Sequence, residues 1–152
     1  MVLCFVIFAR MIKKIEHKGN VIAIIISHRF AKEGIEFFTP NDYSQQLGYM
    51  NHKAGKKIDA HVHNPVKREV TSTQEVLFIK TGKIRVDFYT QKTDYIKSDI
   101  LVSGDIILLA SGGHGFEIIE DTEMYEVKQG PFSIETDKKR FDAVNPNELK
   151  IG

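Results

Sequence analysis

Short strand-like runs that follow one another closely are the feature that most constrains how this chain can fold. In the second half of the sequence, runs rich in β-branched and aromatic residues alternate with turn residues at intervals of roughly eight to twelve positions. The expected strands are Glu75–Thr81, Lys83–Thr90, Tyr95–Val102, Asp105–Ala110, Phe116–Glu120 and Glu123–Lys128, with turns at Thr81-Gly82, Ser103-Gly104 and Asp121-Thr122. This spacing is typical of an all-β sandwich or barrel.

The first half of the chain adds further strands. Val21–Ser27 is a β-branched run suited to a strand that is covered on both faces. The other expected strands are Ile12–Glu16, Ile35–Thr39 and Tyr43–Met50. Val2–Ala9 is apolar, but no basic residues precede it and it is too short to span a membrane. We expect a buried strand there rather than a signal, and Met11 is left open as an alternative start.

Composition and charge narrow the classes of partner and compartment. A chain of 152 residues with 42% hydrophobic content suits one domain covering residues 1–152. A net charge of +1 offers no basic stripe for a phosphate backbone, so no nucleic acid is expected as a partner. The single cysteine, Cys4, cannot form an internal disulfide, which indicates a reducing compartment and predicts a cytoplasmic protein. No membrane partner is predicted either.

The pair His61 and His63 is the first sign of chemistry. Side chains two positions apart leave the same face of a strand, so two imidazoles can converge on one metal ion. A helix would need a spacing of three or four residues instead. A solvated strand face is the alternative interpretation of an isolated His-x-His pair.

The residues around this pair resemble the first motif of the cupin superfamily. Gly55 stands five residues before His61, and Glu75 stands six residues before Gly82, as in that motif. The eleven residues between His63 and Glu75 depart from the motif, which usually has three or four. Either residues 64–74 form a loop inserted between two strands, or Glu75 is displaced from its role as a ligand.

A second stretch resembles the second cupin motif. Gly104 and Gly112 fall where that motif has glycines, and His114 supplies its histidine. Three departures stand out: Ala110 replaces a proline, His114 comes one residue early, and Ile118 stands near the position of an asparagine. One residue early would turn a strand side chain to the opposite face, but the surrounding glycines allow a bulge that could restore its aim.

The resemblance implies a double-stranded β-helix, also called a jelly-roll or cupin barrel, with its motif core at residues 55–128. Residues 1–50 would add N-terminal strands, and residues 137–152 would form a polar tail that is only loosely held. The implied metal ligands are His61, His63, Glu75 and His114. They suit one divalent transition metal ion, with zinc, iron, nickel, manganese and copper left open. Within the superfamily, the chain looks nearest to small single-domain cupins found among bacterial surface-polysaccharide and sugar-nucleotide genes.

Further residues are candidates for binding a small-molecule ligand. Arg68 could grip an anionic group, or it could be a solvated loop arginine. Gln45 could donate an amide into a cavity, or it could lie on a solvated strand. Weaker candidates are Glu117, which would face away from His114 in a regular strand, and Glu126. The histidines without a partner at ligand spacing are interpreted as surface or core residues: His17, His28 and His52.

Three functions remain open at this stage. The first is a metal-dependent enzyme that acts on a small polar, sugar-like molecule by isomerisation, epimerisation or oxidation. The second is a metal- or carbohydrate-binding module without turnover, and the third is a metal-free sugar-nucleotide isomerase in which a histidine is the general base. A homodimer is expected, because Val2–Ala9 and Val21–Ser27 exceed the apolar strand that a small barrel needs.

Overall fold

The computed structural model describes residues 11–133, 135 and 137–152, and these form two compact units. The first unit contains the described residues of Met1–Phe30 together with Thr73–Gly152, and the second is Ala31–Ser72. The strand expected at Val2–Ala9 lies outside the described residues. Within the described ranges, no helix is long and apolar enough to cross a membrane.

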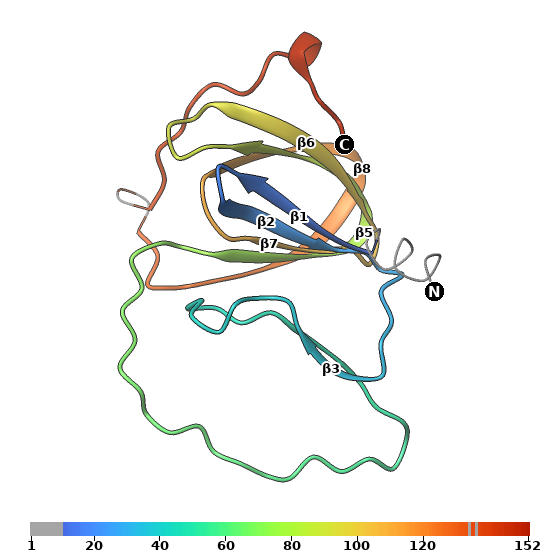
Figure 1. Cartoon of the computed structure of the whole chain (residues 1–152). Coiled ribbons are helices and arrows are strands. Elements are labelled where there is room, and N and C mark those ends of the chain that lie inside the picture. Colours follow the sequence, from blue (N-terminus) through green and yellow to red (C-terminus); the bar gives the residue numbers. More distant parts are fainter. Residues whose placement is uncertain (1–10, 134, 136) are drawn as a thin grey trace. The chain divides into compact units, whose positions relative to one another are not determined.

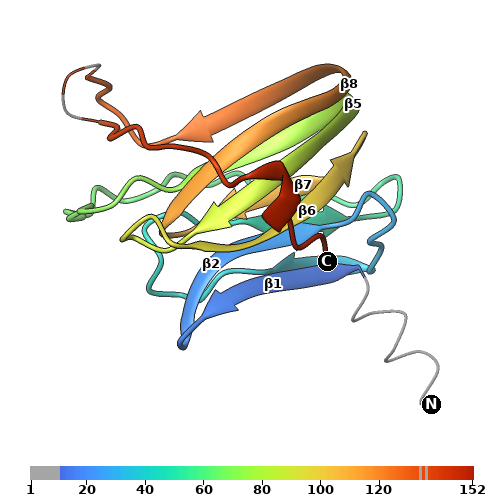
Figure 2. The same ribbon diagram turned by 90° about the horizontal axis from the view of Figure 1, so that it is seen from above.

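The first unit is an antiparallel sheet curled into a half-barrel (Figures 1 and 2). Its strands are β1 (Ile12–His17), β2 (Asn20–Ile26), β5 (Glu75–Tyr89), β6 (Tyr95–Val102), β7 (Ile106–Leu109) and β8 (Gly113–Lys128). They lie in the order β1-β2-β7-β5-β6, and β8 pairs with β5. The prediction of an all-β fold is therefore confirmed.

The hydrophobic core lies on the inner face of this curled sheet. Alternate residues of the strands supply it, because every second side chain of a strand points to the same face. Its buried members include Ile15, Ala23, Ile25, Leu77, Ile79, Ile84, Val86, Phe88, Leu101 and Ile107. The curl also brings β1 and β6 together, since the ammonium of Lys13 lies 2.5 Å from a carboxylate oxygen of Asp99.

Strand β5 is bent at Gly82, and the turn predicted there is wrong. The chain does not reverse at Thr81-Gly82 or at Asp121-Thr122, because these two sites lie opposite each other in the continuous pairing of β5 with β8. The register shifts on both sides of the bend, and the hydroxyl of Thr122 accepts a hydrogen bond from the Lys83 amide. Glycine signals a bend as readily as a reversal, so four expected strands become two long ones.

The bend lets β5 and β8 serve both halves of the sheet. The first part of β5 pairs with β7 and the later part pairs with β6, while β8 runs along the whole of the other side. On the second side of β8, no strand pairs with it among the residues that the structure describes.

The second unit holds one two-stranded sheet of β3 (Gly34–Phe37) and β4 (Gly48–Asn51). The strand expected at Tyr43–Met50 is shorter than predicted, because the Gln46 side chain holds a loop by donating to the carbonyls of Pro40 and Tyr43. The loop ends where β4 begins.

The strand expected around His61 and His63 is not formed. Residues 52–74 contain no strand, and residues 52–73 are all exposed. A strand needs a neighbour for its backbone hydrogen bonds, and the only strand pair described in this unit is β3 with β4.

The C-terminal tail is held more firmly than predicted. The amide of Val144 donates to the Tyr89 hydroxyl, and the amide of Lys150 donates to the Tyr95 hydroxyl, both at 3.0 Å. A short 3-10 turn, Pro146–Glu148, lies between these two contacts. The polar composition of the tail gave no sign of them, because its backbone and not its side chains makes the bonds.

The bend at Gly82 should be intolerant of any side chain. Gly82 has φ +88°, and an added Cβ would lie 2.2 Å from the Asp121 carbonyl oxygen. We expect Gly82→Ala to lower the free energy of unfolding by about 2–4 kcal/mol, measured by urea denaturation, because strain and overpacking add. Gly19→Ala is the control: Gly19 has φ +81° with no atom within 4 Å of the added Cβ, so it should cost only about 1 kcal/mol. Equal losses would contradict the close contact.

Candidate functional site

Glu75 and His114 meet on the inner face of the curled sheet. Glu75 begins β5 and shares the face of the buried residues Leu77 and Ile79, whereas His114 lies in β8 opposite the buried Phe88. The His114 Nε2 atom lies 3.0 Å from Oε2 of Glu75. Two residues taken from two separate sequence motifs are thus in direct contact.

The inward direction of the His114 side chain does not depend on a β-bulge. Its pairing with β5 is regular from Gly113 to Ile118, and the special backbone position is Gly112, just before the strand, with φ +73°. A Cβ on Gly112 would lie 2.3 Å from the Tyr89 carbonyl oxygen. Because it has no side chain, Gly112 lets the backbone at the start of β8 lie close to that of β5. His114 then faces inward because alternate residues of a regular strand point to the same face.

The surroundings of Glu75 favour its ionised form. Glu75 is only 5% exposed. The hydrogen bond with His114 lowers the pKa of Glu75, burial opposes this, and the charges of His114, Lys138 and Lys128 lower it further, so the net pKa lies below the usual value. The two lysine ammonium groups lie 3.7 Å (Lys138) and 3.8 Å (Lys128) from Oε1.

A carboxylate paired with an imidazole can move a proton. A neutral His114 that donates from Nε2 to Glu75 keeps a lone pair on Nδ1, which can accept a proton from a bound molecule. The buried carboxylate then stabilises the imidazolium that forms. Phe116 lies beside the imidazole, with ring centroids 5.3 Å apart.

The same two side chains offer two donors to a metal ion. Ligand atoms about 2.1 Å from one ion and at right angles to each other are about 3.0 Å apart, which matches the separation of Nε2 and Oε2. No group of three or more His, Cys, Asp or Glu side chains suited to a metal occurs within the described residues.

The other two predicted ligands, His61 and His63, belong to the second unit. Their rings meet edge to face with centroids 5.2 Å apart, and Nδ1 of His61 lies 3.0 Å from the Asp59 carbonyl oxygen. The four predicted ligands are therefore divided equally between the two units.

The predicted ligand-binding residues have different surroundings. Arg68 is exposed in the segment without strands. Gln45 is partly buried, and its Oε1 atom is buried without a hydrogen-bond partner among the described residues. Glu117 pairs with Arg85 on the face opposite to His114, as its spacing predicted. Glu126 lies near the site, with Oε1 3.3 Å from the Lys128 ammonium.

Two residues of the site were missed by sequence reasoning. Lys128 ends the expected strand Glu123–Lys128, where the apolar Tyr125 and Val127 alternate with it and would place it on the outer face. It instead shares the inner face with Met124, which packs against the core. Lys138 lies in the tail beyond β8, where no periodic pattern indicates a direction. Of the three histidines set aside, His28 bonds to Asp105 through both its amide and its Nδ1 atom, which is a structural contact.

Comparison with known proteins adds no relative, since no family model, curated protein or solved structure matches the chain.

The lowered pKa of Glu75 predicts how stability depends on pH. A carboxylate with a lower pKa in the folded state stabilises the fold above its unfolded pKa, about 4.5, and this contribution is lost as pH falls through the folded value. We expect Glu75→Gln to be less stable than the parent at pH 7 by urea denaturation, with the difference shrinking below about pH 4.5. The exposed Glu120, 3.8 Å from Lys83, is the control, because Glu120→Gln should change little. A difference that stays constant from pH 7 to pH 3 would contradict the assignment.

Proposed function

We propose that this chain is a cupin-like protein that binds a small polar molecule at Glu75 and His114 and moves a proton on it. The proposed fold is a double-stranded β-helix. Its support is the curled antiparallel sheet, in which β5 and β8 are bent and each contributes to both halves. Sugar-like ligands are the proposed class, following the resemblance of both motifs to cupins.

The contact between His114 and Glu75 carries this proposal. A histidine held by a buried carboxylate is a common arrangement for a general base, because the carboxylate fixes the ring and stabilises its charged form. In an isomerisation, Nδ1 would accept a proton from a carbon beside a carbonyl group and return it to the adjacent carbon of the enediol. An epimerisation would also need a proton donor on the opposite face of the first carbon. Lys128 and Lys138 could donate hydrogen bonds to the oxygen that gains charge.

A metal-binding cupin is the second candidate function. The separation of Nε2 and Oε2 favours it, since two ligands of one ion lie at this distance. His61, His63, His114 and Glu75 stay as the predicted ligands of one divalent transition ion, which would supply a Lewis acid to a bound carbonyl or hydroxyl. Binding without turnover remains the alternative for either kind of site.

The homodimer also stays a prediction, although one of the two apolar segments that motivated it is buried within a single chain. Ile22, Ala23, Ile24, Ile25 and Ile26 of β2 are already buried in a single chain, between β1 and β7. The apolar surplus that motivated the dimer is now confined to Val2–Ala9. Light scattering at micromolar concentration tests it.

Proton transfer by His114 can be tested without knowing the natural substrate. Nucleotide sugars and sugar phosphates would be incubated with the protein in deuterated water, and NMR would follow the exchange of carbon-bound protons in the presence of a chelator. We expect His114→Gln to slow exchange by about 100-fold or more, because it removes the base, and Glu75→Gln to slow it less. Lys80→Gln, which removes a surface lysine paired with Glu123, is the control. Exchange that survives in His114→Gln, or that stops with the chelator, would contradict metal-free proton transfer.

Metal binding should show the pH dependence of imidazole ligands. Purified protein should carry about one divalent ion per chain by elemental analysis, and its affinity should fall as pH drops through roughly 6 to 7, because protons compete for the same nitrogens. Glu75→Gln should weaken binding less than His61→Ala if the long segment after His63 displaces the carboxylate. An affinity that is flat between pH 7 and pH 5 would exclude histidines as the main ligands.

A further inference from the structure

The C-terminal segment of residues 144–152, here called the strap, lies along the outer edge of β6. Ser98 forms a parallel bridge with Ile151, in which the Ser98 amide donates to the Lys150 carbonyl and the Gly152 amide donates to the Ser98 carbonyl. At Ser98, the edge of β6 that faces away from β5 is thus paired with the C-terminal segment. This is the geometry of a peptide strand added to a sheet edge.

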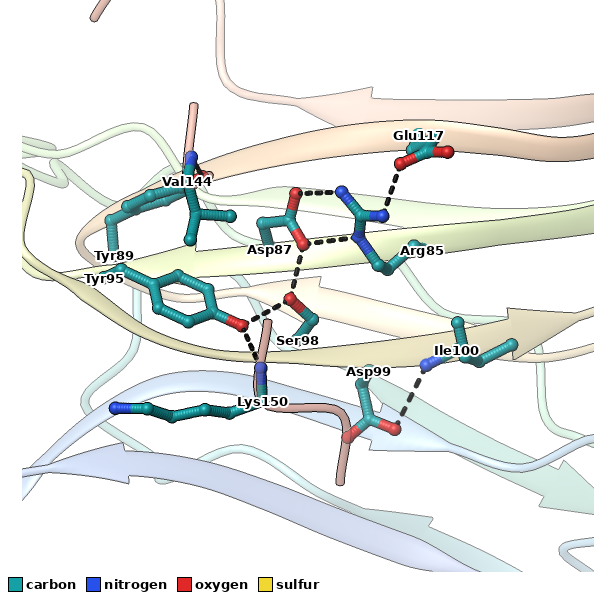
Figure 3. Close-up of polar contacts among 10 residues, drawn as sticks. All are labelled: Arg85, Asp87, Tyr89, Tyr95, Ser98, Asp99, Ile100, Glu117, Val144 and Lys150. Carbon is teal, nitrogen blue, oxygen red and sulfur yellow. Dashed lines mark hydrogen bonds and ion pairs between the residues drawn. The ribbon is translucent and has the colours of Figure 1, made fainter. Parts of the chain in front are cut away.

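Two tyrosines hold the strap in addition to this bridge. Tyr89 comes from the end of β5 and Tyr95 from the start of β6, and their hydroxyls accept the amides of Val144 and Lys150. Figure 3 shows both hydroxyls next to the strap, with the Tyr95 hydroxyl also 2.7 Å from Oγ of Ser98.

The surface beneath the strap is fixed by its own hydrogen bonds. Arg85 donates to both carboxylate oxygens of Asp87, at 2.8 and 3.0 Å, and the Ser98 hydroxyl donates to one of them (Figure 3). Asp87 and Ser98 are 3% and 0% exposed. This network joins Tyr95, through Ser98, to Asp87 and Arg85, so the strap contacts a surface that has its own internal hydrogen bonds.

The strap is recognised mainly through its backbone. Every contact described above uses a strap amide or carbonyl, and the strap residues are exposed except for Val144 and Leu149, which are partly buried. A backbone held by a few bonds at the surface opens more readily than a core strand.

The strap begins just after a packed aromatic residue. Phe141 is anchored against Tyr89, with ring centroids 4.9 Å apart, and the strap begins three residues later. Asp142 and Ala143 are the only residues between the anchor and the first bond of the strap. The nine residues of the strap would span about 30 Å if fully extended.

We propose that the outer edge of β6, with Tyr89 and Tyr95, is a docking site for an extended peptide strand. This chain fills the site with its own strap, and when the strap detaches the site accepts the same segment of a second copy. A second copy fits because its segment presents the same two amides at the same spacing and the same bridge to Ser98. The strap thereby controls access to the site by direct competition.

The test uses the full chain and a fluorescent peptide with the sequence of residues 143–152. Lys150→Pro in the chain removes the amide that binds Tyr95, and the extended backbone of Leu149 tolerates a following proline. We expect fluorescence anisotropy to show the peptide binding about tenfold more tightly to Lys150→Pro than to the parent, because the parent's strap competes at high effective concentration. A peptide with proline at the position of Lys150 should bind several-fold more weakly.

Two further variants assign the binding to the tyrosine hydroxyl. Tyr95→Phe added to Lys150→Pro should weaken the peptide several-fold, whereas Tyr125→Phe, which alters an exposed tyrosine on β8, should not. Equal binding by the parent and Lys150→Pro, or no binding by either, would overturn the proposal.

Hydrogen exchange on the parent protein is an independent check that needs no variant. The amides of Val144, Lys150 and Gly152 should exchange faster than those of the pairing between β5 and β6. If they exchange only as fast as the whole protein unfolds, the strap does not detach and the proposal fails.

Discussion

The pairing of β5 with β8 is the constraint on which the rest of the first unit depends. These strands, of 15 and 16 residues, stay paired through a bend that shifts the register several times. Because β5 changes its other neighbour from β7 to β6 at the bend, both halves of the sheet share one backbone ladder. The curl, the enclosed core and the meeting of Glu75 with His114 all follow from this continuity.

A buried carboxylate at that position is stable only because its charge is compensated. The Glu75 carboxylate is nearly excluded from water, and burial alone would raise its pKa and favour the neutral acid. The His114 hydrogen bond and two nearby ammonium groups reverse that tendency. The site therefore keeps a negative charge in a buried position. That charge can stabilise the imidazolium that forms when His114 accepts a proton.

Much of the fold could be predicted from the sequence, because runs such as Val21–Ser27 and Tyr95–Val102 are rich in β-branched or aromatic residues and are bounded by turn residues. The turn at Gly82 was predicted wrongly, since whether a glycine reverses or bends a chain depends on the partner strand opposite it. In β8 the faces could not be assigned from hydrophobicity: Tyr125 is 60% exposed, while Met124 packs against the core.

The candidate site, like the fold, could be predicted only in part from the sequence. Glu75 and His114 were singled out from their resemblance to two motifs, although each departs from the usual spacing, and the structure places their side chains 3.0 Å apart. Lys138 and the strap could not be found, because segments without periodicity are placed by tertiary contacts alone. The His61-x-His63 spacing is compatible with a strand, but residues 52–74 form none, since spacing cannot supply a neighbour.

The second side of β8, which has no strand partner among the described residues, also bears on solubility. A long row of free backbone amides and carbonyls is a template for another strand, and proteins commonly protect such edges with charge. β8 carries Glu117, Glu120 and Glu123, whose side chains are more than half exposed. Each of these carboxylates is paired with a cation of β5, so a strand added to this edge would have to accommodate or break a row of surface ion pairs, which disfavours edge-to-edge association.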